Sequence, residues 1–167
     1  MVSIEEIQAV YYMVAATGVL VAAAYYVLNM RAQNINREAQ LFMNIANQSF
    51  NNPDWLKAWR LVCCTKWSSA KEFMELQAYP NESEFGEAYT IIGAFFESLG
   101  VFVKEGLIDI RLVALLLTGF VKPFFEMVIP YLPEVRADLR MPRFLSETEY
   151  LYHELVGYIE KHPEIVT

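Results

Sequence analysis

Twenty consecutive residues without a charge, Ala9 to Leu28, constrain this chain more than any other feature of its sequence. At about 1.5 Å of rise per residue, a helix of this length crosses a hydrocarbon core of about 30 Å. Tyrosines, which favour the membrane interface, lie near both ends of the run: Tyr11, Tyr12, Tyr25 and Tyr26. The run predicts one transmembrane helix, within an anchor at residues 1–30. The alternative is a core helix of a soluble protein.

The charges around this run predict its orientation. The leader before it holds two acids and no base, whereas a secretory signal peptide begins with basic residues and has a shorter apolar stretch. Arg31 and Arg37 follow the run, and basic residues favour the cytoplasmic side. We expect a single-pass protein of the cell membrane, with the lipid bilayer as a partner and the C-terminal domain in the cytoplasm.

The length of the chain after the anchor and the charge of the whole chain limit the number of domains and the kinds of partner that the protein can have. About 130 residues suffice for one hydrophobic core. The formal net charge of -7 opposes binding to phosphate backbones, so no nucleic-acid partner is expected. The only cysteines, Cys63 and Cys64, are adjacent, so we expect no disulfide and interpret both as small buried apolar residues.

Helix signals recur along the whole chain, and no alternating strand pattern is found. Ser3 with Glu6 forms a capping box that begins the first helix. Apolar residues recur every three or four positions after Arg31, which predicts that this helix continues as an amphipathic stalk over residues 31–50 and packs on the domain. Asn52 and Pro53 then begin a second helix. We predict an all-α protein with a cytoplasmic helical bundle at residues 51–167.

Further sequence signals predict where individual helices of the bundle begin and end. An apolar helix is expected over residues 82–104, ended by Gly106. Asp109 caps the next predicted helix, which Pro123 should kink. Its apolar run is too short for a second span, so a buried core helix is expected. Ser146 with Glu149 is the capping box predicted to open the last helix.

Three segments carry a family resemblance: FFESLGVFVKEGLIDIRLV at residues 95–113, REAQLFMNI at 37–45 and EYLYHEL at 149–155. Together they resemble an uncharacterised prokaryotic family of membrane-anchored helical proteins, a domain of unknown function. The similarity covers roughly residues 37–160. The resemblance implies an anchored all-helical protein and brings no reaction or site residue.

Gly86, Gly93 and Gly100 recur every seven residues along one stripe of the predicted helix over 82–104. Glycine destabilises a helix interior, so the spacing favours close approach of another helix over the stripe. Glu97 lies among these glycines and should bond to a neighbouring helix or pair with Lys104. Either the stripe is a packing surface with a satisfied acid at its rim, or Glu97 belongs to a ligand or proton site.

No sequence motif points to an enzyme, a metal site or a cofactor. Only His153 and His162 are present, which is too few for a carboxylate-bridged metal cage. Within the predicted span, Gly18 and Ala22 allow a second transmembrane helix to approach.

The leading function hypothesis is a non-catalytic interaction or accessory subunit of a membrane assembly, with a protein partner or a homo-oligomer formed through the span. The alternative is a membrane-bound enzyme or small-ligand sensor with a pocket near Glu97. The two hypotheses differ in whether the domain holds a pocket beside that carboxylate.

Overall fold

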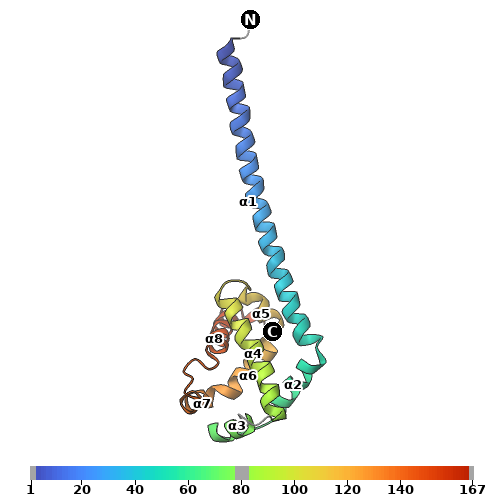
Figure 1. The fold of residues 1–167 in the computed structure, drawn as a ribbon, viewed down its shortest axis with the longest axis vertical. Coiled ribbons are helices and arrows are strands. Elements are labelled where there is room, and N and C mark those ends of the chain that lie inside the picture. Colours follow the sequence, from blue (N-terminus) through green and yellow to red (C-terminus); the bar gives the residue numbers. More distant parts are fainter. Residues whose placement is uncertain (1–2, 78–82, 166–167) are drawn as a thin grey trace. The chain divides into compact units, whose positions relative to one another are not determined.

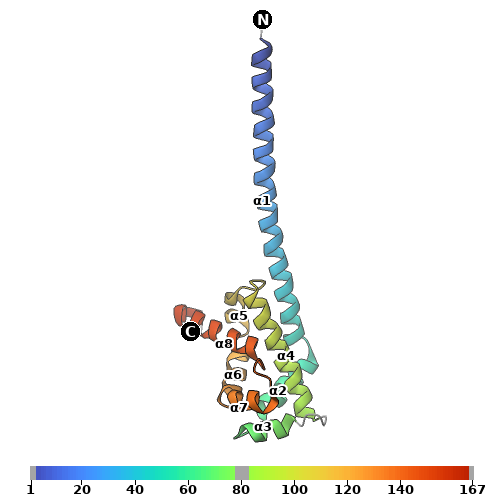
Figure 2. The same cartoon turned by 60° about the vertical axis from the view of Figure 1, so that its left-hand side comes forward.

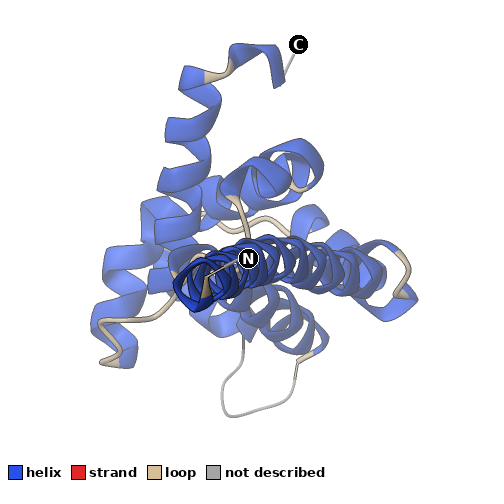
Figure 3. Cartoon of the chain, turned by 90° about the horizontal axis from the view of Figure 1, so that it is seen from above, coloured by secondary structure: helices blue, strands red, loops and turns tan. Residues whose placement is uncertain are grey.

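The structure, a computed structural model, describes residues 3–77 and 83–165, and none of these residues lies in a β-strand (Figure 3). The all-α prediction is confirmed: a long apolar N-terminal helix is followed by a helical bundle. The elements are α1 (Ile4–Phe50), α2 (Pro53–Cys64), α3 (Ala70–Gln77), α4 (Glu84–Lys104), α5 (Ile110–Leu116), α6 (Thr118–Val128), η1 (Ile129–Tyr131), α7 (Leu132–Leu139), α8 (Ser146–Lys161) and η2 (Pro163–Ile165) (Figure 1). The chain forms two compact units, Met1–Leu41 and Phe42–Thr167.

The first unit is the N-terminal part of α1. The predicted capping box is present: the Glu6 amide donates to Ser3 Oγ at 3.2 Å, and the Ser3 amide donates to Glu6 Oε2 at 2.8 Å. Every residue from 3 to 37 is exposed, including large apolar side chains such as Leu20, 71% exposed. This helix is long and apolar enough to span a membrane.

The second unit is a helical bundle centred on α4, which packs against α2 and α8 (Figure 2). The last turns of α1 contribute Phe42, Ile45 and Ser49 to its interior. Helix α4 also has the length and apolar composition of a membrane span, as would the bent pair formed by α5 with Thr118–Leu139. The buried face of α4, which includes Ile92, Phe96 and Leu99, forms the core of the bundle.

Local signals set several helix ends as predicted. Asn52 caps α2 by accepting hydrogen bonds from the amides of Asp54 and Trp55, with Pro53 at the first helical position. Gly106 follows α4 with φ of 66°, a left-handed conformation that glycine adopts without a steric penalty.

The predicted helix after Asp109 differs from the structure in where it breaks. Asp109 caps α5 as expected, but the helix bends at Leu117, by 91°, and α6 runs through Pro123. The bend accompanies full burial of Leu117 and Val121. The buried apolar side chains outweigh the cost of interrupting one helix. Helix α7, which begins at Leu132 and has Pro133 in its first turn, has no counterpart in the prediction.

Candidate functional site

A side chain of α4 caps the first turn of α8. The Thr148 amide and the Thr148 hydroxyl both donate to Glu97 Oε2, each at 2.8 Å. The residue before the helix, Leu145, has left-handed backbone with φ of 54°, and Ser146 is the first helical residue. No side chain of the local sequence caps α8. The predicted capping box of Ser146 with Glu149 is therefore wrong, and Glu97 takes the capping role across 51 residues of chain.

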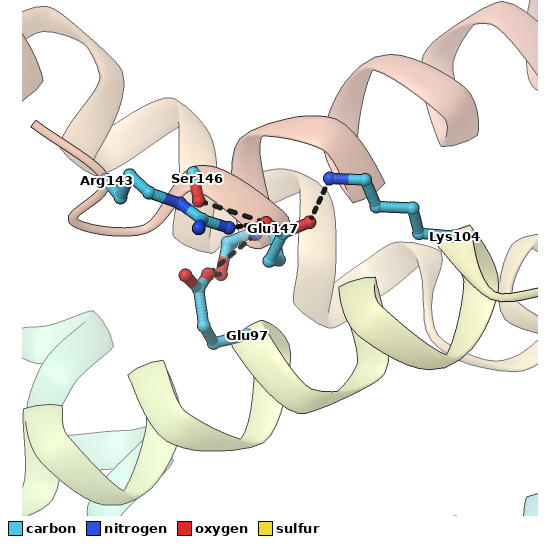
Figure 4. A network of polar contacts seen from close by, with 6 residues as sticks. Glu97, Lys104, Arg143, Ser146 and Glu147 are labelled. Atoms are coloured by element: carbon cyan, nitrogen blue, oxygen red, sulfur yellow. Dashed lines mark hydrogen bonds and ion pairs between the residues drawn. The ribbon is translucent and has the colours of Figure 1, made fainter.

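Glu147, next to Thr148, gathers a second set of polar contacts (Figure 4). Its carboxylate accepts from Lys104 Nζ at 2.8 Å, from Arg143 at 3.1 Å and from Ser146 Oγ at 3.2 Å. Lys104 thus pairs with Glu147, while Glu97 bonds to the neighbouring helix. The sequence pointed to Glu97 through its glycine neighbours but contained no signal for Glu147, because its main partner lies 43 residues away in the chain.

The three glycines of α4 have different surroundings. A methyl group at Gly100 would overlap the Glu147 carbonyl oxygen, so the backbones of α4 and α8 meet there. A methyl group at Gly86 would overlap the Gln77 carbonyl oxygen and Ser83 Oγ, the cap of the same helix. At Gly93 it would make only ordinary contacts, of 3.7 Å to Leu145 and 3.8 Å to Tyr89.

A pocket of about 620 Å³ opens beside Gly93 and Glu97. One wall is α4, and the opposite wall is the segment from Leu139 to Leu145 that joins α7 to α8. Gly86 also lines it, so three of the predicted site residues border one cavity. The volume lies within the range typical of small-molecule sites, about 300–1,000 Å³.

Tyr89 lies in the wall of this pocket and is 3% exposed. Its hydroxyl is buried and has no hydrogen-bond partner among the residues that the structure describes. Burial, and secondarily the negative charge of Glu97, raises the pKa of the phenol, so Tyr89 stays neutral at physiological pH. A buried donor without a hydrogen-bond partner destabilises the fold, so such groups are unusual in a packed core.

The other candidate residues lie elsewhere. Gly18 and Ala22 are on the exposed part of α1, and a methyl group at Gly18 would have no neighbour within 4 Å. Within residues 3–77 and 83–165, no group of three or more His, Cys, Asp and Glu side chains is placed to hold a metal ion. Cys63 and Cys64 are free thiols; Cys63 is only partly buried and Cys64 is exposed, so the interpretation of both as buried residues was wrong.

We predict that the Glu147 contacts make the domain sensitive to acid. The hydrogen bond from Lys104, supported by those from Arg143 and Ser146, lowers the pKa of Glu147 below its usual 4.5. As pH falls below 4.5, Glu147 takes up a proton in the unfolded chain before it does so in the folded chain. The stabilisation from these contacts is therefore complete well above pH 4.5, and it is lost as pH falls through the lowered pKa. Urea unfolding at pH 7, 5, 4 and 3 measures the loss.

The matched control for this prediction is Glu147→Gln, which cannot titrate. The variant should be less stable than the parent at pH 7 and should lose less stability on acidification. Equal acid dependence of the two proteins would show that Glu147 is not the titrating group.

Comparison with known proteins gives one family. No curated protein and no solved structure matches the chain. The model of the DUF4760 family, described as a domain of unknown function, matches residues 12–155. This match includes the apolar part of α1, the glycines and Glu97 of α4, and the start of α8 that Glu97 caps. The chain therefore belongs to the DUF4760 family, in agreement with the resemblance found in its sequence.

Proposed function

We propose that this protein is a membrane-anchored, non-catalytic accessory subunit. In this proposal α1 crosses the bilayer once, with its N-terminus outside, and the helical domain contacts a protein partner at the cytoplasmic face of the membrane. The α1 helix also packs against a transmembrane helix of the partner or of a second copy.

The observation that carries the proposal is the exposed first part of α1. Its uncharged residues 9–28 are all exposed, and apolar surface on this scale is stable in lipid or against a partner but not in water. The bases Arg31 and Arg37 support the cytoplasmic side for the domain. Gly18 and Ala22 support helix association because they leave room for a second backbone.

Labelling of Cys64 tests the orientation. This thiol is exposed in the domain, so in intact cells a membrane-impermeant maleimide should react with it only after permeabilisation. Cys63→Ser gives a chain with this single native thiol. In a chain lacking both native cysteines, Val2→Cys should instead react without permeabilisation. The opposite pattern for the two positions would reverse the topology.

Exchange of the small residues tests the association. We expect Gly18→Ile to reduce, severalfold, either energy transfer between labelled copies in bilayers or capture of a membrane partner by the full chain. Leu20→Ile is the control, since residue 20 faces away from residue 18 on the helix and the volume is unchanged. Association that is equally strong in the Gly18→Ile variant would contradict packing through this face.

A second candidate function is binding of a small ligand by the domain. The specific observation in its favour is the cavity beside Glu97, which a purely structural bundle does not require. The two proposals are compatible, because a ligand bound in the domain could control the contact with a partner. Substitutions in the pocket should leave the membrane topology unchanged, so the two functions can be tested separately.

A further inference from the structure

The pocket beside Glu97 has mostly apolar walls. Leu139, Met141, Phe144 and Leu145 form the side that faces α4, and Ala94 lies on α4 itself. Met141 is 53% exposed, and its flexible side chain can adapt to ligands of different shape. Such walls favour the apolar body of an organic molecule over an inorganic ion.

Gly93 keeps this space open. Its hypothetical methyl group would meet neighbours only at ordinary distances, so helix packing does not require glycine at this position. A helix interior favours almost any other residue over glycine, by up to about 1 kcal/mol. The absence of a side chain is therefore best explained by the volume that it leaves in the pocket.

One carboxylate oxygen of Glu97 remains available as a hydrogen-bond acceptor. Thr148 occupies Oε2 twice, whereas Oε1 accepts no hydrogen bond from the residues that the structure describes. In Figure 4, only one of the two Glu97 carboxylate oxygens carries dashed lines. A carboxylate oxygen beside a cavity calls for a donor, and a positively charged donor gives the stronger bond.

The charges around the pocket favour a cation over an anion. Arg143 also lines the cavity, but its guanidinium bonds to Glu147, and its side chain is 83% exposed. Lys104 likewise pairs with Glu147. The two bases thus share one carboxylate, and the charge of Glu97 remains without a cationic partner among the described residues.

We infer that this pocket binds a small organic amine, with its ammonium group on Glu97 Oε1 and its apolar body between Gly93 and the segment from Leu139 to Leu145. The inference rests on the second candidate function and gives it a ligand class.

Three matched compounds test the ligand class: 4-phenylbutylamine, 4-phenylbutan-1-ol and 4-phenylbutanoate. They share an apolar body and differ in the polar end. Each is titrated into the full chain in lipid nanodiscs, and the backbone amide signals of Gly86 and Gly93 report binding by nuclear magnetic resonance. Gly18 and Gly157, which lie outside the pocket, serve as internal references.

The amine should shift the Gly86 and Gly93 signals saturably. The alcohol should bind about tenfold more weakly, as expected for loss of one charged hydrogen bond, and the acid more weakly still. Glu97→Gln retains an acceptor for Thr148 and should weaken the amine about tenfold while leaving the alcohol unchanged. Gly93→Leu should abolish binding of both, and Gly157→Leu, at an open position of α8, should not.

The outcomes separate the ligand class from the pocket. Equal binding of all three compounds, or an amine affinity unchanged by Glu97→Gln, would overturn the amine assignment and leave a general apolar site. Failure of every compound to move the two glycine signals would overturn both the assignment and the second candidate function. An unchanged Gly106 signal in each variant, together with an unchanged Gly157 signal in the variants that retain this glycine, shows that the domain is still folded.

Discussion

Gly100→Ala should destabilise the domain, although alanine is the better helix former by up to about 1 kcal/mol. The added methyl group would overlap the Glu147 backbone, and a backbone cannot move aside as a flexible side chain can. Overpacking of a well-packed contact typically costs about 1–3 kcal/mol, and a contact between two backbones should cost at least that much. The sign of the effect is therefore opposite to that expected from helix propensity.

Urea unfolding followed by tryptophan fluorescence measures this effect, because all three tryptophans lie in the second unit. Gly157→Ala is the control: its surroundings are open, so the same exchange should stabilise that helix by a fraction of a kcal/mol up to about 1 kcal/mol. A Gly100→Ala variant as stable as the parent would show that α4 and α8 are not in backbone contact.

Two N-terminal truncations should differ even more in stability. A chain beginning at residue 31 lacks the apolar run and should be soluble and folded, because the helix turns that reach the core are retained. A chain beginning at residue 51 loses Phe42 and Ile45, both about 95% buried, together with the contact of the Phe50 ring with Phe120 at 5.5 Å.

Removing two large core side chains costs several kcal/mol, since Phe→Ala and Ile→Ala substitutions cost about 3–5 and 2–5 kcal/mol respectively. That sum approaches the whole stability of a typical domain, about 5–15 kcal/mol. We therefore expect the shorter chain to unfold without a cooperative transition or to aggregate. Circular dichroism during heating distinguishes the two chains, and equal melting temperatures would place the end of α1 outside the core.

The elements that the sequence predicted well have local causes. Asn52 caps its own helix, Ser3 and Glu6 bond to each other, and Gly106 terminates α4 by its own conformational freedom. Each of these signals involves residues within a few positions of one another. Sequence patterns can be interpreted directly in such cases.

The features that the sequence did not predict depend on distant partners. The bend at Leu117 follows from burial in the bundle, which no local motif marks. Ser146 has the sequence of a cap but does not act as one, because Glu97 from α4 provides the acceptor. For the same reason, the glycine spacing identified the correct helix and the neighbourhood of the pocket, but it did not distinguish the close contact at Gly100 from the open space at Gly93.

The cap that α4 provides also sets an order of events during synthesis. Helix α8 has no side-chain cap from its own segment. Forming the first turn is the step of helix formation that costs the most free energy. The first turn of α8 therefore gains a side-chain cap only when α4 has formed and presents Glu97. Translation proceeds from the N-terminus, so α4 leaves the ribosome before α8. The helix that carries the capping carboxylate is therefore available before the helix that it caps.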